Sequence, residues 1–574
     1  MKKILTNIVK KAIHSVFQVE CDPMIQLAGR PEYGDYQANF AMRLSKLLQK
    51  NPMDIANAVM LELKDEPLFE SLVVAAPGFI NIFLKNSAIA TILEKIATDD
   101  RLGVAPIEKP ESVVVDYANA NVAKEMHVGH IRSIVLGDAI VRLLEFVGHT
   151  VIRQSHLGDW GTQFGMLIEH LIERGDAHRA FSVSDLDPFY KQAKQRFDAD
   201  SDFAERARQR VVALQSGDPE TTSIWKKLVK ESLAYFQKIY IKLDTLLTED
   251  DARGESFYND LLPGVIAELQ NKHIATLSDG AVVVFLDGFK GPDGEAFPMI
   301  IQKKDGGYLY ATTDLAAALF RIQTLRATRL IYLTDARQKQ HFAMVFAALR
   351  LWGVADASIR LEHIPFGAVL GPDNKPFKTR SGESIKLADL LAEAEVRALT
   401  LAQSKNTSLS ETELRSITHD IGIGALKYAD LRNEKQKDYV FDWDKLLSFE
   451  GNTAPYLQNA YVRIQAIFRK GDIDIASLRT KSIVIETEAE HILAVTLLGF
   501  SDVAHSVADQ LSLHSLCDYL YGLASLFHRF YEECPILSNS DQAIRDSRLS
   551  LSDLTARILQ LGLHLLGIRV VDRM

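Results

Sequence analysis

A strand, a short glycine-containing turn and a long helix follow one another between residues 113 and 148, and this succession constrains the fold most. The apolar run VVVDY predicts a buried strand. The turn AKEMHVGH leads into a helical pattern with an apolar stripe from Ile131 to Leu143, and Gly148 predicts the end of that helix. Another strand follows in TVIRQS, so we expect a βαβ unit within a parallel sheet.

Further apolar runs and helical patterns repeat this plan toward residue 390. Strands are expected at 281–286, 299–302 and 329–335, and helices at 314–326 and 339–351. Together they predict a doubly wound parallel sheet covered by helices, which is a Rossmann-like α/β fold of the nucleotide-binding type. We place this domain at residues 109–390, with a charged and mostly helical insertion at about 180–280.

Different patterns flank this domain on both sides. Residues 1–108 combine helical patterns with a strand in SLVVAAPGFINIFL, which predicts an N-terminal α+β domain, and the proline-containing APIEKPES is typical of a linker. After residue 390 the strand signals fade, so residues 391–574 are expected to form an all-α bundle.

Composition narrows the class of protein. The 574 residues suffice for three or four domains, and the three cysteines are too few and too scattered for a disulfide framework, so a reducing, cytoplasmic compartment is expected. No window approaches about 18 uninterrupted apolar residues, so we expect no membrane span. A net charge of -10 argues against indiscriminate binding to DNA or RNA, so any polyanion must be met by a local basic patch.

The histidines of HVGH are the first candidates for chemistry. If the turn joins the strand to the helix, His127 and His130 lie at a helix N-terminus, where free N–H groups favour anions such as a nucleotide triphosphate. Gly129 would let a flat base approach the backbone. The imidazoles could then donate hydrogen bonds to phosphate oxygens and stabilise the charge that develops during transfer.

Two other interpretations of the pair stay open from these residues alone. The histidines could be structural, or they could bind a metal together with Glu125. HExxH is absent, and histidines three residues apart are common without metal, so we expect no protein-bound metal.

Several longer motifs share one resemblance. The strings are DYANANVAKEMHVGHIRS, HLGDWGTQFGML, GGYLYATTDLA, RQKQH, FGAVLGPDNKPFKTRSG, KYADLRN, FDWDKLLSFEGNTAPYLQNAYVRI and the closing GIRVVDRM. Together they resemble the bacterial arginyl-tRNA synthetases, a class I family, over nearly the whole chain. HVGH stands where that class carries its HxGH signature. The resemblance implies that His127, Gly129 and His130 bind ATP as its Mg²⁺ complex.

The motifs around the signature depart from the family pattern. Upstream, Ser-x-Pro-Asn is replaced by Ala-Asn-Ala-Asn, which keeps Asn121 but loses the proline, so a less rigid turn is expected. The lysine-rich KMSKS loop appears only as KPFKTRS. Family members of this kind are thought to compensate with a lysine just before HxGH, which is Lys124 here. Lys124, Lys378 and Arg380 are therefore our candidates for balancing the leaving pyrophosphate.

The resemblance also implies a pocket for L-arginine. Asp116, Tyr310 and Asp314 would surround the side chain, Asn121 and Gln338 would hold the α-amino group, and His127 would lie near the α-carboxylate. Because a guanidinium presents five donors, such a pocket should reject lysine strongly. From the residues alone, Asp314 could instead cap a helix, Asp116 could serve a turn and Tyr310 could belong to a core.

The expected partner is tRNA(Arg). The resemblance implies an arginine–tRNA ligase that needs bound tRNA for activation, acylates the 2′-OH first and acts as a monomer. The helical domain would bind the anticodon through Tyr456, Met574 and Asn459, the last standing where relatives often have a tyrosine. GDYQAN, with Tyr36, Gln37 and Asn39, resembles a module that binds the tRNA elbow, although a turn in an ordinary α+β domain explains it nearly as well.

Two other functions stay open. The chain could be another HxGH nucleotidyltransferase acting on a small acid, or an inactive synthetase-like RNA-binding protein. A helical C-terminal third argues against the first. The intact HVGH and Lys124 argue against the second.

Overall fold

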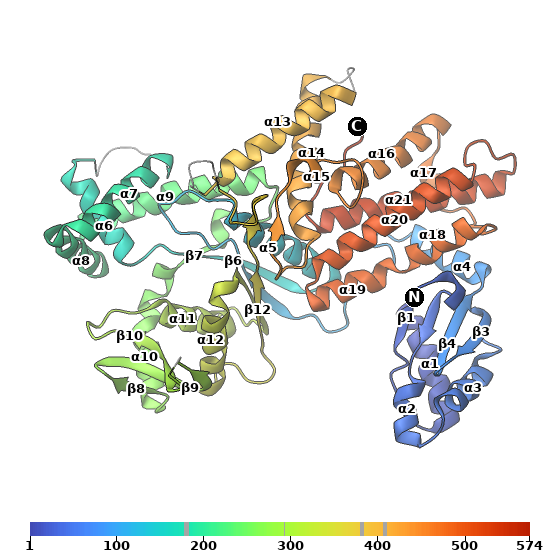
Figure 1. The fold of residues 1–574 in the computed structure, drawn as a ribbon, viewed down its shortest axis with the longest axis horizontal. Helices are drawn as coiled ribbons and strands as arrows, with labels where there is room; N and C mark the ends of the chain where they lie inside the picture. The colour runs from blue at the N-terminus through green and yellow to red at the C-terminus, as the bar shows by residue number, and fades with distance from the viewer. Residues whose placement is uncertain (177–182, 292, 379–383, 406–409, 574) are drawn as a thin grey trace. The chain divides into compact units, whose positions relative to one another are not determined.

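The computed structural model describes residues 1–176, 183–291, 293–378, 384–405 and 410–573 (Figure 1). The chain divides into two compact units, each with its own core. The first unit combines Met1–Pro106, Phe449–His564 and Arg569–Met574, and the second combines Ile107–Ser448 and Leu565–Ile568. The N-terminal domain and the C-terminal helices therefore belong to one unit, although they are far apart in the sequence.

A five-stranded parallel sheet forms the centre of the second unit. Its order is β12 (Arg360–Phe366), β11 (Arg329–Asp335), β5 (Ser112–Asp116), β6 (Thr150–Leu157) and β7 (Ala252–Gly254). All four pairings are parallel, so the carboxyl ends of the strands meet at one edge. The middle strand, β5, is buried on both faces, as its continuous valine run predicts. The expected doubly wound α/β fold is confirmed.

Helices connect and cover these strands. The principal ones are α5 (Gly129–Val147), α11 (Tyr310–Gln323) and α12 (Lys339–Trp352), with α10 (Leu262–Asn271) beside them. Gly148, with a φ of 105°, ends α5 because the left-handed conformation lets its N–H and that of His149 bond back to the last turn. The helix patterns found in the sequence at 314–326 and 339–351 correspond to α11 and α12.

One part of the expected sheet is wrong. The runs at 281–286 and 299–302 do not join the parallel sheet but form a separate antiparallel one, with β8 (Ala275–Ser278), β9 (Ala281–Lys290) and β10 (Ala296–Gln302) in the order β10-β9-β8. The two-residue turn Asp279–Gly280 has positive φ at both positions, which is the geometry of a tight hairpin. A hairpin makes neighbouring strands antiparallel, so the apolar runs were read correctly as strands but with the wrong partner.

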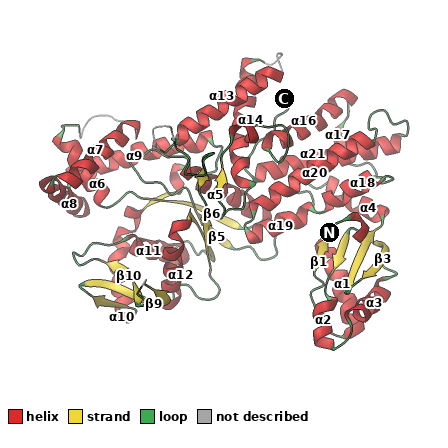
Figure 2. Cartoon of the chain, viewed as in Figure 1, coloured by secondary structure: helices red, strands yellow, loops and turns green. Residues whose placement is uncertain are grey.

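The insertion in the second unit is a helical subdomain. It contains α6 (Thr162–Glu173), α7 (Val183–Ala199), α8 (Ser201–Gln215) and α9 (Pro219–Lys242), which lie side by side in Figure 2. Asp200 and Asp218 cap α8 and α9. The helical part ends at Lys242, earlier than the expected limit near residue 280, because β7 and the antiparallel sheet follow.

Two further helices extend the second unit beyond the boundary expected at residue 390. These are α13 (Leu387–Lys405) and α14 (Glu411–Leu431), followed by β14 (Tyr439–Val440), which pairs with β13 (Val369–Leu370), and by α15 (Trp443–Leu446). Arg132 of α5 pairs with Asp430 of α14 at 3.1 Å, and both side chains are buried. This ion pair fixes α14 on the nucleotide-type fold, so the helical character of residues 391–448 does not mark a separate domain.

The first unit contains an antiparallel sheet and a helical bundle. Its N-terminal elements are α1 (Lys2–Phe17), β1 (Ile25–Leu27), β2 (Tyr36–Ala38), α2 (Ala41–Leu48), α3 (Pro52–Leu63), β3 (Phe69–Ala75), β4 (Phe79–Leu84) and α4 (Asn86–Ala97), with the sheet order β1-β2-β4-β3. The single strand expected in SLVVAAPGFINIFL is a hairpin of β3 and β4. His491 joins the sheet to the bundle through Asp35 and Asn86, each at 2.7 Å.

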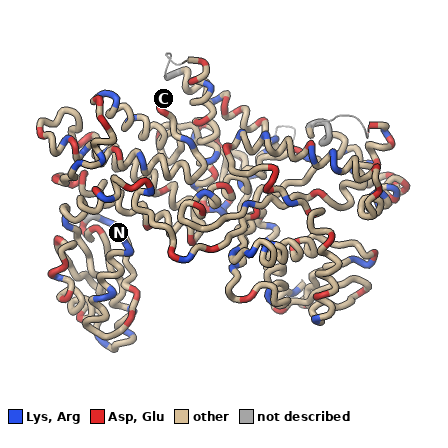
Figure 3. Tube along the Cα trace, turned by 180° about the vertical axis from the view of Figure 1, so that it is seen from behind, with Lys and Arg blue, Asp and Glu red and all other residues tan. Residues whose placement is uncertain are grey.

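The bundle is formed by the last helices of the chain. They are α16 (Ala454–Gly471), α17 (Ile475–Leu478), α18 (Glu488–Leu498), α19 (Phe500–Gln510), α20 (Leu513–Glu533) and α21 (Gln542–Leu565). The segment Glu488–Gln510 is long and apolar enough to cross a membrane, but it consists of two helices with 56% of its most apolar window buried, as in the core of a bundle. Basic and acidic residues are interspersed along the trace (Figure 3).

Candidate active site

The HVGH turn lies at the N-terminus of α5, beside the carboxyl end of β5. The His127 and His130 rings are 4.1 Å apart between centroids. The Gly129 N–H donates to His127 Nδ1 at 3.1 Å, and the His127 N–H donates to His130 Nδ1 at 3.0 Å. A Cβ at Gly129 would lie 2.9 Å from His127 Cε1, so a side chain there would displace the ring.

The hydrogen bond from Gly129 indicates the tautomer of His127. Its Nδ1 accepts the Gly129 N–H, so in the neutral form the proton is on Nε2, which stays available as a donor. His130 Nδ1 lies 3.0 Å from the His127 N–H and 3.2 Å from the His127 carbonyl oxygen, so either tautomer of His130 finds a partner there. Burial and the nearby His127 lower the pKa of His130 to about 4. Burial and, second, Arg337 lower the pKa of His127. Both shifts favour the neutral imidazole at pH 7, and His127 Nε2–H is a donor that suits phosphate oxygens.

The segment after the KMSKS-like loop runs along this turn. Val128 N–H donates to the Ile385 carbonyl at 2.8 Å, and Leu387 N–H donates to the Met126 carbonyl at 2.9 Å. The backbone of Lys378 pairs with Ser384, and its side chain is exposed. The backbone of Lys378 is thus paired with the segment that contacts the HVGH turn, whereas Arg380 lies outside the described residues.

Lys124 lies three residues before His127 of the signature and faces the helical insertion. Its ammonium is 4.1 Å from the centroid of the Tyr190 ring on α7. In the described part of the chain Lys124 makes no ion pair, whereas its neighbour Glu125 pairs with Lys386 at 2.5 Å. The positive charge of Lys124 is therefore not neutralised locally.

Asp116 is the last residue of β5, and only one of its two carboxylate oxygens has a partner among the described residues. Arg321 of α11 approaches Asp116 Oδ2 at 2.8 Å and also donates to Gln154 Oε1 at 2.6 Å. Asp116 Oδ1 is buried and has no hydrogen-bond partner among the described residues. A buried carboxylate oxygen without a partner is costly unless a ligand supplies the donor. The interpretation of Asp116 as a turn residue does not explain this oxygen.

Asp314 lies in the second turn of α11 and contacts His341. Because α11 begins at Tyr310, Asp314 is inside the helix, so the alternative that it caps the helix is wrong. His341 Nε2 and Asp314 Oδ2 are 2.6 Å apart, and the Tyr310 and His341 rings are 4.8 Å apart. Tyr310 is 62% exposed, so the interpretation of it as a core residue is also wrong.

The two residues expected to hold the α-amino group are exposed near the same edge. Asn121 pairs with Gly158, and Asn119 Oδ1 accepts the His156 N–H at 3.0 Å. Gln338 follows β11 in a short helical turn, η4 (Ala336–Gln338). The Ala-Asn-Ala-Asn segment is thus held by hydrogen bonds to the HLGDWG loop, and the expected lower rigidity of this turn stays a prediction.

Glu255 is a third acidic residue at this edge that the sequence did not reveal. It follows β7 in η3 (Glu255–Leu261) and faces Asp159 and Asp314. Burial, together with these two carboxylates, raises the pKa of Glu255 to about 8. Asp159 itself accepts hydrogen bonds from the N–H and Oγ of Ser256. The sequence signal that could have pointed to Glu255 is its position directly after the short strand β7. That strand was not expected from the sequence.

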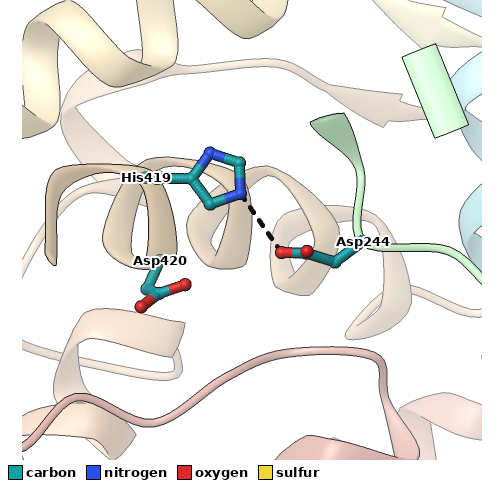
Figure 4. A group of neighbouring side chains, drawn as sticks. All are labelled: Asp244, His419 and Asp420. Carbon is teal, nitrogen blue, oxygen red and sulfur yellow. Dashed lines mark hydrogen bonds and ion pairs between the residues drawn. The ribbon is translucent and has the colours of Figure 1, made fainter. Parts of the chain in front are cut away.

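A separate cluster in the second unit combines Asp244, His419 and Asp420 (Figure 4). Both ring nitrogens of His419 face carboxylates, Asp244 at 3.2 Å and Glu395 at 3.0 Å. The hydrogen bond to Asp244 raises the pKa of His419, and the one to Glu395 acts in the same direction. Because both ring nitrogens are engaged by carboxylates, we interpret the group as a structural ion-pair cluster.

Family models match nearly all of this chain, and curated relatives of known function match its whole length. The family model described as "tRNA synthetases class I (R), catalytic domain" matches residues 91–443, the "Arginyl tRNA synthetase N terminal domain" matches 3–84, and the "DALR anticodon binding domain" matches 457–574. The arginine–tRNA ligases of Shigella dysenteriae and Escherichia coli K12 are 48% identical over the full length of both chains. The chain belongs to the arginyl-tRNA synthetases.

Solved structures of this family have the same fold. The arginyl-tRNA synthetase of Plasmodium falciparum superimposes with a TM-score of 0.87 at 29% identity and covers 100% of this chain and 99% of its own. That of Thermus thermophilus reaches 0.83 at 24% identity and covers both chains completely. This arginyl-tRNA synthetase is an arginine–tRNA ligase with a class I catalytic domain.

The synthetase's expected anticodon residues lie on the bundle. Tyr456, near the start of α16, is half-buried beside Tyr521 and His528 of α20, and its hydroxyl lies 3.0 Å from His528 Nδ1. Asn459 is half-buried one turn further along α16. Met574 lies outside the described residues.

The synthetase's GDYQAN segment forms β2, and its alternation separates the three expected residues. Tyr36 points into the core and is 1% exposed, so its ring is not available to RNA. Gln37 points to the opposite face and donates to Asn81 Oδ1 at 2.7 Å. Asn39 follows the strand and is half-buried. A surface role for Tyr36 is therefore corrected, whereas Gln37 and Asn39 remain candidates.

Proposed function

We propose that this enzyme activates L-arginine with Mg-ATP to arginyl-adenylate and transfers the arginyl group to the terminal ribose of tRNA(Arg). The observation that carries this proposal is Asp116 Oδ1, a buried acceptor without a hydrogen-bond partner among the described residues. An N–H of a bound guanidinium would supply the missing donor. Asp314 supplies a second carboxylate, already held by His341. The exposed Tyr310 ring contacts His341, the residue that pairs with Asp314.

The chain's own groups position the substrates and balance charge. Neutral His127 donates from Nε2, and His130 from its ring N–H, to phosphate oxygens while the arginine carboxylate attacks the α-phosphorus and pyrophosphate leaves. Lys124 and Lys378 meet the charge of the departing pyrophosphate. A ribose hydroxyl of tRNA then attacks the arginyl carbonyl, and AMP leaves. No side-chain nucleophile takes part, as in other phosphoryl-transfer sites that act by orientation.

The proposal also includes the residues that contact tRNA, the requirement for tRNA in activation, and the location and oligomeric state of the enzyme. Tyr456 and Asn459 would contact anticodon bases, since splayed bases stack on aromatic side chains. Gln37 and Asn39 would contact the tRNA elbow. Activation would require bound tRNA, the 2′-OH would be acylated first, and the enzyme would act as a cytoplasmic monomer.

The decisive experiment is ATP–pyrophosphate exchange with each of the twenty amino acids, with and without tRNA(Arg). We expect arginine to be the one amino acid that supports exchange, and to do so only when tRNA is present. Exchange with arginine in the absence of tRNA would contradict the tRNA requirement but not the ligase activity. No exchange from folded protein that still binds tRNA would overturn the proposal and favour an inactive RNA-binding protein.

A further inference from the structure

The helical insertion holds the residue directly before Lys124. Ser232 of α9 is fully buried, and its Oγ accepts the N–H of Ala123 at 2.9 Å while donating to the Leu228 carbonyl at 2.8 Å. Ala123 has a φ of 63°, a left-handed conformation that non-glycine residues rarely adopt. Ser232 therefore fixes a backbone conformation that Ala123 alone would not favour, and this conformation sets the direction in which the next residue leaves.

A second helix of the insertion holds the Lys124 side chain. The Tyr190 ring of α7 lies 4.1 Å from the ammonium, well within the range of a cation–π contact. Tyr190 is itself partly buried against a small core that includes Met166 and Phe203, so the ring is anchored. An aromatic face orders an ammonium without neutralising it, whereas a carboxylate would cancel its charge.

We propose that the helical insertion positions Lys124 for adenylate formation, with Ser232 holding the backbone and Tyr190 holding the ammonium. This inference rests on the proposed function, in which Lys124 meets the leaving pyrophosphate. It assigns a role in the chemical step to α7 and α9, which contribute no group to the arginine pocket or to the HVGH turn among the described residues. Tyr190 and Ser232 are positioning residues, because they act through Lys124.

The test compares Tyr190→Leu with Tyr190→Phe in arginine-dependent ATP–pyrophosphate exchange with tRNA present. Leucine keeps the apolar packing but removes the ring, so kcat should fall by about 3- to 30-fold with the KM for arginine unchanged. Phenylalanine keeps the ring face and should restore kcat to within about twofold. An equal fall in both Tyr190 variants would overturn the proposal.

Phe197 provides a matched control on the same helix. It is partly buried against the same core, and Lys194 lies 5.7 Å from its ring centroid, but Lys124 does not contact it. Phe197→Leu should leave kcat within about twofold of wild type. If Phe197→Leu and Tyr190→Leu lower kcat equally, the effect reflects packing of the insertion, and the proposal fails.

A double variant separates this inference from the proposed function. With Lys124→Met as background, Tyr190→Leu should cause no further loss, because the ring then has no cation to position. A further loss of the full Tyr190→Leu size would overturn the inference while leaving the ligase activity intact. A wild-type enzyme without arginine-dependent exchange would instead contradict the proposed function itself.

A spectroscopic measurement supplies a readout that does not depend on activity. After reductive ¹³C-methylation, the methyl signal of Lys124, assigned with Lys124→Arg, should be shifted upfield by the Tyr190 ring current. Tyr190→Phe should keep this shift and Tyr190→Leu should abolish it. A Lys124 signal at the same position in wild type and Tyr190→Leu would show that the ring does not hold the ammonium in solution.

Discussion

At the scale of single residues, Glu255 should make the charge of the proposed arginine site depend on pH. Its pKa, raised to about 8 by burial and by Asp159 and Asp314, leaves the carboxyl largely protonated at pH 7 and ionised above pH 9. The ionised form attracts a guanidinium, so the KM for arginine should fall by roughly threefold between pH 7 and 9. Glu255→Gln should remove this dependence. If the KM for arginine changed with pH in the same way in wild type and in Glu255→Gln, Glu255 would not be the group responsible.

Asp314 permits a second test at this scale. Asp314→Asn removes a charged acceptor that His341 holds in place, so the KM for arginine should rise at least about 10-fold with the KM for ATP unchanged. Steady-state exchange measures both, and Glu411→Gln, which removes an exposed ion pair with Arg415 on α14, is the control. An unchanged KM for arginine would leave Asp314 with no role in recognition.

At the scale of elements, α5 carries the HVGH turn and packs against the residue that follows β5. A Cβ at Gly137 would overlap the Tyr117 ring, so Gly137→Ala should lower the free energy of unfolding by about 1–3 kcal/mol and displace the turn. Gly264 of α10 has open space around it, and Gly264→Ala should be neutral or stabilising by up to about 1 kcal/mol. Urea denaturation measures the free energy of unfolding of both variants. Equal changes in the two variants would show that the close approach of α5 to Tyr117 does not require glycine at position 137.

The sequence predicted elements better than it predicted their partners. Periodicity located β5, α5, β11 and α12, because a buried strand and an amphipathic helix leave a local pattern. The antiparallel pairing of β8, β9 and β10 was missed, although the Asp279–Gly280 turn signalled a hairpin. Within the site, Arg321 beside Asp116 could not be foreseen, because nothing local links residues 205 positions apart, whereas Asp314 was found only through the family resemblance.

At the scale of the whole molecule, the chain forms two units, and the residues proposed to bind arginine and ATP all belong to the second. Three or four domains were expected from length, but the sequence could not show that α13 and α14 complete the nucleotide-type fold. The contacts responsible are between residues distant in the chain, such as Arg132 with Asp430. Helical periodicity is the same on either side of such a boundary.

This division predicts where ligands stabilise the enzyme. A ligand that binds one folded unit stabilises it by mass action, by about 2.7 kcal/mol at 100 times its Kd. Arginine with a non-hydrolysable ATP analogue should therefore slow amide hydrogen exchange in residues 113–130, 310–341 and 384–387, and leave α18 and α20 unchanged. tRNA(Arg) alone should slow exchange around Tyr456, because the bundle carries the expected anticodon contacts. Protection of α18 and α20 by arginine and nucleotide without tRNA would mean that the two units unfold as one cooperative body.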